Sequence, residues 1–96
     1  MPTLPYTLEN KVLRSQLTKS SASAGANYEE SQGGSSKADF TNKVRISLRE
    51  MRESYYWLRI IKRTVKEVNA VELDYLVKES GELKKILGAI VQKSRE

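Results

Sequence analysis

The chain has 96 residues, of which 17 are Lys or Arg and 12 are Asp or Glu, so its formal net charge is +5. It contains no cysteine and no histidine, which excludes a disulfide framework and removes both the commonest general base and the commonest zinc ligand. A chain of this length forms one domain, near the small end of the sizes that bury their own core. The positive balance favours nucleic acid or an acidic protein as a partner.

The first six residues contain both prolines, Pro2 and Pro5, and predict an extended leader (1–6) before a single helical domain at 7–96. This leader lacks the basic and apolar regions of a signal peptide. No apolar run in the sequence approaches the roughly 20 residues that a membrane span needs. We therefore expect a cytoplasmic protein that does not associate with membranes.

The first predicted helix runs from Leu8 to about Ser31, with apolar and small residues at helical spacing. Residues 20–26 are only serine, alanine and glycine, so another helix backbone can approach closely there. No histidine is present to activate these serines, and adjacent Glu29 and Glu30 point about 100° apart on a helix, which disfavours shared metal coordination. We expect no catalytic residue, no metal site and no cofactor.

The central helix is predicted from Lys37 to Lys66, with a serine before it as N-cap and Asp39 in its first turn. One apolar stripe steps by three or four residues, with one gap at Lys62, and is expected to face the core: Phe40, Val44, Leu48, Met51, Tyr55, Leu58 and Val65. A second apolar row lies on roughly the opposite side and is predicted to form an oligomer interface: Ile46, Trp57, Ile60 and Ile61.

A third row of this helix is cationic. The segment 37–66 holds nine Lys or Arg against three Asp or Glu, so the positive surplus of the chain resides there. Guanidinium groups at helical spacing can follow phosphates, and Tyr56, in the same row, can stack on a base. The predicted nucleic-acid-binding residues are Arg45, Arg49, Arg52, Arg59, Lys62 and Arg63. The alternative is a solvated face whose arginines pair with Glu9, Glu29, Glu30 or Glu82 of neighbouring helices or subunits.

The last predicted helix covers about Val71 to Lys93. Gly81 and Gly88 lie seven residues apart on one flank, where a neighbouring helix is expected to come close because glycine is otherwise costly in a helix. The short connections between the three helices predict antiparallel neighbours. One apolar stripe runs along this helix: Leu73, Leu76, Val77, Ser80, Leu83, Leu87, Ile90 and Val91.

Several uncommon stretches follow one another along the chain: KSSASAGANYEESQGG at 19–34, SKADF at 36–40, ISLRE at 46–50 and YWLR at 56–59. This series resembles the bacterial four-helix-bundle family that is named after proteins encoded in intervening sequences of 23S ribosomal RNA genes. The acidic and then apolar tail from Glu72 resembles the fourth helix of that family. The likeness covers nearly the whole chain after Leu17.

The resemblance implies an up-down helical bundle that assembles as a ring of subunits, commonly five. A related bundle is the accessory protein of the reverse transcriptase of diversity-generating retroelements, where a basic ring surface binds nucleic acid. Family members normally carry a whole amphipathic helix before the segment at Leu17, whereas this chain has the leader and the start of its first helix. The difference indicates either a truncated start or a natural three-helix variant, and in both cases self-association is expected to cover the exposed face.

The sequence thus predicts an all-α, antiparallel up-down bundle with three long helices of the four-helix-bundle type, completed by self-association, with a pentamer implied by the family. The predicted function is a non-catalytic oligomeric scaffold whose basic surface binds RNA or DNA. The alternative is a protein–protein interaction module whose arginine row pairs with an acidic partner protein and has no nucleic-acid role. A small enzyme is the third hypothesis. It ranks last because no convergent set of catalytic groups and no small-molecule site is evident in the sequence.

Overall fold

The computed structural model describes residues 8–33, 36–64 and 69–95, and these form three helices and no strand. The helices are α1 (Leu8–Gln32), α2 (Lys37–Thr64) and α3 (Ala70–Ser94). The prediction of an all-α chain with three long helices is confirmed. The leader at 1–6 and the predicted end of the central helix at 65–66 lie outside the described residues.

Side-chain caps begin the second and third helices. The Ser36 Oγ accepts a hydrogen bond of 3.0 Å from the backbone N–H of Asp39, and the Asn69 Oδ1 accepts one of 3.0 Å from Glu72. These bonds satisfy donors that the first turn of a helix leaves without a partner. A serine cap before the central helix was predicted, and Ser36 provides it.

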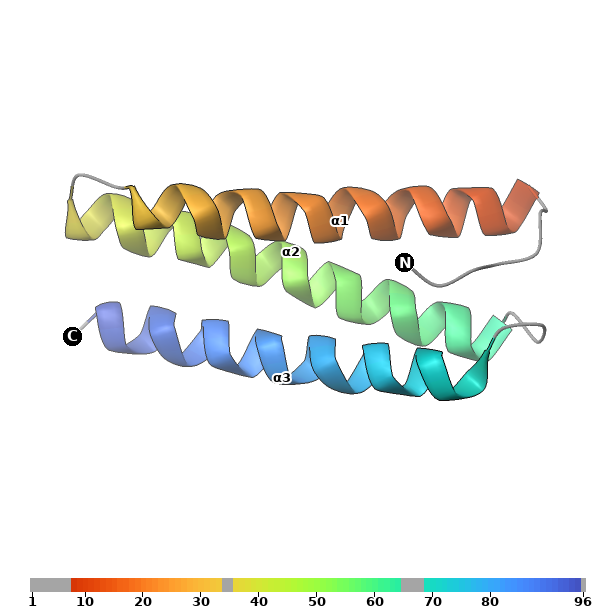
Figure 1. The fold of residues 1–96 in the computed structure, drawn as a ribbon. Coiled ribbons are helices and arrows are strands. Elements are labelled where there is room, and N and C mark those ends of the chain that lie inside the picture. The colour runs from red at the N-terminus through yellow and green to blue at the C-terminus, as the bar shows by residue number, and fades with distance from the viewer. Residues whose placement is uncertain (1–7, 34–35, 65–68, 96) are drawn as a thin grey trace.

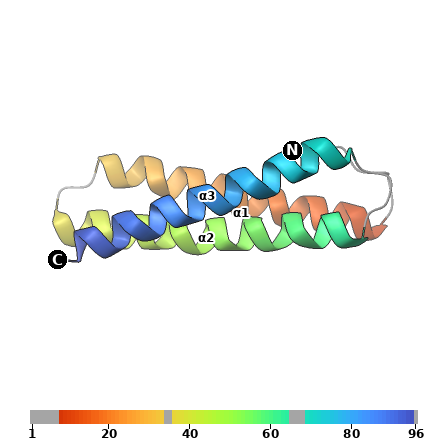
Figure 2. The same cartoon turned by 90° about the horizontal axis from the view of Figure 1, so that it is seen from below.

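In Figure 1, α2 lies between α1 and α3, and both views show that the chain reverses direction between successive helices (Figures 1 and 2). Among the described residues, α2 contacts both neighbours, and no Cα atom of α1 lies within 8 Å of a Cα atom of α3. The Cα atoms extend over 45 × 21 × 14 Å. A single chain is therefore an open arrangement of helices, and its completion into an oligomeric bundle remains a prediction.

The contact between α2 and α3, which we call the α2–α3 seam, is made of aliphatic side chains. The apolar stripe predicted for α2 supplies Val44 and Leu48, and the stripe predicted for α3 supplies Leu87 and Val91, all of which are buried in one cluster. A second cluster toward the other end joins all three helices and contains Leu17, Leu58, Ile61 and Leu73. Together these clusters form the core.

The contact between α1 and α2, the α1–α2 seam, is made largely of small residues. The Oγ atoms of Ser20 and Ser54 are 2.9 Å apart and share a buried hydrogen bond. The Ser47 Oγ donates a bond of 2.7 Å to the carbonyl oxygen of Ala24 across the same seam. A side chain as short as serine reaches the opposite backbone only when the two helices are close, as the small residues at 20–26 predicted.

Within the described helices, none combines the length and the apolar character needed to cross a bilayer.

Candidate nucleic-acid interface

Five arginines share one face of α2, and we call this row the arginine stripe: Arg45, Arg49, Arg52, Arg59 and Arg63. At about 100° of rotation per residue, their spacing places all five within about 40° of a common direction. All five side chains are exposed, as is Tyr56, which lies in the same row. The buried serines of the α1–α2 seam and the buried aliphatic residues of the α2–α3 seam occupy the other sides of the helix, so the stripe faces outward.

Few carboxylates neutralise the stripe. Arg49 pairs with Glu50 at 3.8 Å, and the guanidinium of Arg59 lies 5.4 Å from the ring centroid of Tyr55. Within the described part of the chain, Arg45, Arg52 and Arg63 make no ion pair. Their charge is therefore directed to solvent in a single subunit.

The glutamates that the alternative hypothesis assigned to the arginines do not pair with them in the described part of one subunit. Glu30 instead binds the Nζ of Lys43 at 3.0 Å, and this hydrogen bond and charge raise the pKa of Lys43. The contact ties the end of α1 to α2.

Lys62 was predicted to bind nucleic acid together with the arginines. It lies about 100° around the helix from Arg63, and its Nζ forms an ion pair of 2.5 Å with Asp74 of α3. Lys62 therefore belongs to the contact with α3, and we remove it from the candidate interface.

Among the ion pairs of the described residues, one joins the arginine stripe to a carboxylate, and that carboxylate belongs to Glu50. Burial raises the pKa of its carboxyl, and the neighbouring Glu53 carboxyl raises this pKa further, while Arg49 and Lys19 lower it to a smaller extent. The half-buried carboxylate therefore holds its negative charge less readily than an exposed glutamate does.

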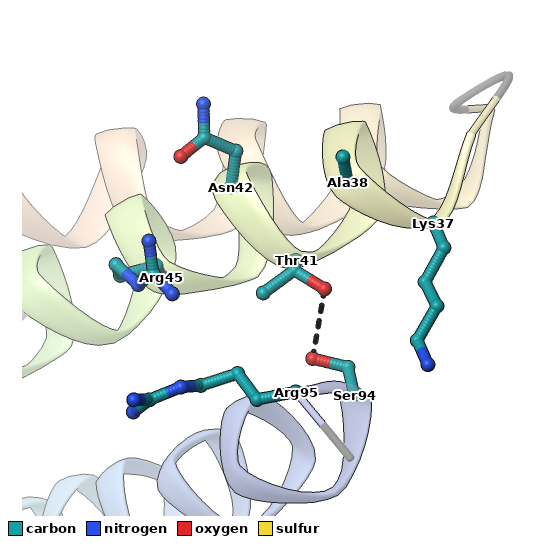
Figure 3. Close-up of a pocket in the computed structure, with 7 residues that line it drawn as sticks. All are labelled: Lys37, Ala38, Thr41, Asn42, Arg45, Ser94 and Arg95. Atoms are coloured by element: carbon teal, nitrogen blue, oxygen red, sulfur yellow. Dashed lines mark hydrogen bonds between the residues drawn. The ribbon is translucent and has the colours of Figure 1, made fainter.

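A wide cleft of about 740 Å³ lies where the start of α2 meets the end of α3. A hydrogen bond joins the two helices at this cleft. Figure 3 shows Arg45 of the stripe and Arg95 on one side of this bond and Lys37 on its other side. In that bond Thr41 Oγ1 donates to Ser94 Oγ over 2.9 Å. The cleft extends the cationic face from α2 onto α3 at one end of the molecule.

A second polar cleft of about 280 Å³ lies between the middle parts of the same two helices. The Lys84 Nζ lies 4.0 Å from the ring centroid of Tyr55, and the lining also includes Lys78 and Lys85. These lysines and Arg95 were missed at the sequence level. Lys84 and Arg95 are eleven residues, or three turns, apart and hence share a face, but only the register of α3 against α2 places them beside the stripe.

One member of the second apolar row of α2, Ile61, is placed differently from the prediction, while the interface role of the other three stays a prediction. Ile46, Trp57 and Ile60 are half-buried, and Trp57 packs against the cluster that joins the three helices. Ile61 is 0% exposed and belongs to that cluster. Ile61 is therefore a core residue of one subunit, and its assignment to a subunit interface was wrong for that reason.

The larger exposed apolar surface lies on the opposite side of α2 from the stripe. There a groove of about 310 Å³ opens between α1 and α3, with α2 as its floor. Its walls include Tyr28 of α1 and Leu83 and Ile86 of α3, which are 40%, 44% and 55% exposed. Leu83 was predicted to lie on the core stripe, and Ile86 was not predicted to be functional, because the separation of α1 from α3 is a tertiary feature that no single helix reveals.

Within the described residues, no group of three or more acidic side chains is arranged to hold a metal ion. Ser20 and Ser21 direct their hydroxyls to the Leu17 carbonyl oxygen, at 3.2 and 2.8 Å. These serines thus cap backbone carbonyl groups within the helix.

Comparison with known proteins confirms the resemblance that the sequence motifs indicated. The model of a family described as 23S rRNA-intervening sequence protein matches residues 2–89. The chain is also similar to the crystal structure of a protein of unknown function from the S23 ribosomal protein family of Bacteroides thetaiotaomicron VPI-5482, with 35% identity and a TM-score of 0.76. The match covers 83% of this chain and 73% of that chain. No curated protein matches the sequence.

Proposed function

The chain belongs to the 23S rRNA-intervening sequence protein family, and from this premise we propose that it is a non-catalytic scaffold of several copies that binds the phosphate backbone of RNA or DNA. The observation that carries the proposal is the exposed arginine stripe, of which three members make no ion pair within the described residues. Guanidinium groups that lack an ion-pair partner attract a polyanion, and the polyanion releases its condensed cations when it binds.

The surroundings of the stripe support a polyanionic ligand over a small one. The two clefts beside it bring Lys84, Lys85 and Arg95 of α3 to the same side as the arginines of α2. Along α2 the stripe runs from Arg45 to Arg63, which are about 27 Å apart at 1.5 Å per residue. Cations distributed over such a length suit the repeating charge of a nucleic-acid backbone.

The apolar groove supports the self-association part of the proposal, with a second copy of the chain as its occupant. One chain supplies both a hollow, floored by Ser47 and Met51, and an exposed ridge, formed by Leu83 and Ile86. A surface that carries a hollow and a ridge together can dock with another copy of itself. Exposed apolar patches of this kind mark interaction sites on soluble proteins.

The nucleic-acid part is tested by filter binding with random-sequence RNA, single-stranded DNA and duplex DNA across a salt series. We expect affinity to fall steeply with salt for all base compositions. The double variant Arg52→Gln/Arg59→Gln removes two candidate phosphate contacts. The slope of log affinity against log salt concentration should therefore become shallower by about two. The matched control Lys11→Gln/Arg14→Gln removes two exposed cations from α1 and should leave the slope unchanged.

Absence of binding at low salt, or binding that ignores salt, would overturn the nucleic-acid proposal. It would leave the acidic partner protein, the alternative hypothesis from the sequence, as the ligand of the arginine stripe. A control double variant that weakens binding as much as the stripe variant would show that net charge and not the stripe is responsible.

The self-association part is tested by light scattering at micromolar concentration. The substitution Ile86→Lys places a charge on the ridge and should shift the chain toward monomer, because an unpaired charge is costly to bury in an apolar contact. Val71→Lys is the matched control, since Val71 is 81% exposed on α3 and does not line the groove. A monomeric native chain, or equal effects of the two variants, would contradict docking through the groove.

A further inference from the structure

The arginine stripe is interrupted near its middle by an aromatic residue. Neighbouring arginines in the stripe are three or four residues apart except for Arg52 and Arg59, which are seven apart, or about 10.5 Å along the helix. Tyr56 lies between them on the same face. The cations on either side of this interval can hold phosphates, while the interval itself offers an aromatic ring.

The ring of Tyr56 is both accessible and supported. The residue is 53% exposed, and its ring packs edge to face against Trp57, with centroids 5.1 Å apart and an angle of 75° between the planes. Trp57 in turn packs against the core cluster that joins the three helices. A ring held in this way loses less conformational freedom on binding than a mobile one, which favours stacking.

The bases of a duplex are stacked inside it and are not offered to Tyr56, whereas those of a single strand are free to stack on an exposed ring. We propose that the arginine stripe binds single-stranded nucleic acid, with phosphates held by Arg52 and Arg59 and an unpaired base stacked on Tyr56. This inference rests on the proposed function and specifies its ligand.

The experiment compares three DNA probes of equal length: a single strand, its duplex, and a single strand in which abasic sites replace the bases. We expect the single strand to bind more tightly than the other two probes. Tyr56→Leu should weaken its binding about tenfold, in the range of one lost base–aromatic contact, while Tyr56→Phe should keep it. Tyr75→Leu is the matched control, because Tyr75 is 61% exposed on α3 and lines none of the clefts described above.

Salt dependence separates the ring from the charges. Tyr56→Leu should lower the affinity for the single strand at every salt concentration without changing the slope, because the substitution removes no cation. Fluorescence of Trp57, the only tryptophan, should respond to the single strand more than to the abasic strand, because a base that stacks on Tyr56 changes the surroundings of the neighbouring indole.

Equal affinity for the single strand, the duplex and the abasic strand, or an unaltered affinity in Tyr56→Leu, would overturn base stacking while leaving backbone binding by the stripe intact. Failure of all three probes to bind at low salt would overturn both the stacking inference and the proposed function. A loss in Tyr56→Phe equal to that in Tyr56→Leu would also overturn the inference, since Phe keeps the ring.

Discussion

The two seams of α2 use different side chains, although one helix takes part in both. Toward α1, the helix buries serines that hydrogen-bond to a serine hydroxyl and to a backbone carbonyl oxygen. Toward α3, it buries valine and leucine against leucine and valine. In the first seam the backbones are close and hydrogen bonds fix the register, whereas in the second, side-chain volume fills the space between the helices.

This difference predicts opposite sensitivities. A seam in which small residues bring the backbones together has no room for added atoms, so it is damaged by larger side chains. A seam filled by aliphatic side chains is damaged when their volume is removed, because a cavity remains. Both seams hold α2 in position, so both affect how the arginine stripe and the groove are presented.

The largest expected effect is the loss of volume from the α2–α3 seam. Leu48→Ala should reduce the free energy of unfolding by about 2–5 kcal/mol, which is the range for truncating a buried leucine to alanine. Urea unfolding at one fixed protein concentration measures it, since self-association would change apparent stability. Leu83→Ala, at a leucine that is 44% exposed, is the control and should cost much less. Equal losses would show that Leu83 is covered, as docking of another copy would do.

The second effect is the addition of volume to the α1–α2 seam. Ala24 is 2% exposed, and its carbonyl oxygen receives the Ser47 hydroxyl, so Ala24→Leu should force the helices apart at a cost of about 1–3 kcal/mol. Ala26→Leu, at an exposed position two residues away, should be nearly neutral. Thermal unfolding of both variants makes the test, and a neutral Ala24→Leu would mean that α1 is not held closely against α2.

Helical periodicity was sufficient to predict the elements of this fold. The apolar stripes of α2 and α3 include most of the residues that these helices bury in the core, such as Val44 and Leu87, because a period of three or four residues selects one side of a helix whatever it packs against. The exposure of the arginines also follows from their shared face. These properties are local, and the sequence carries them directly.

Tertiary arrangement was less predictable. Ile61 was assigned to an interface because it lies away from the main stripe, but α1 and α3 both contribute to the cluster that buries it. The groove wall at Ile86 and the cations Lys84 and Arg95 depend on which side of α3 meets α2 and on the distance between α1 and α3. Such relations between helices have no periodic signal in any one of them.

A smaller effect distinguishes the two glycines of α3, which were expected to mark close approach. A Cβ added at Gly81 would lie 3.2 Å from the Tyr55 ring, whereas one added at Gly88 would meet nothing within 4 Å. Gly88→Ala should therefore stabilise the chain by up to about 1 kcal/mol through helix propensity. Gly81→Ala should gain less, because the ring must shift. Thermal unfolding at matched concentration compares the two, and a loss in Gly88→Ala would indicate a neighbour, such as another copy, at that face.

The smallest expected effect depends on pH and concerns Glu50, whose side chain is 17% exposed. Burial, and then the Glu53 carboxyl, raise the pKa of Glu50 above its ordinary value, so the folded chain retains a proton that the unfolded chain releases. The stabilising contribution of this group is complete below the ordinary pKa and is lost as the pH rises through the raised value.

At neutral pH the charged Glu50 is therefore less favourable in the folded chain than in the unfolded one. Glu50→Gln should raise the melting temperature slightly at pH 7 and should lose this advantage at pH values below the ordinary glutamate range. Glu82→Gln, at an exposed glutamate of α3, is the control and should show no such dependence. A melting temperature that falls in Glu50→Gln at pH 7 would show that the contact with Arg49 outweighs burial and the repulsion from Glu53, and that this part of the arginine stripe is neutralised within the subunit.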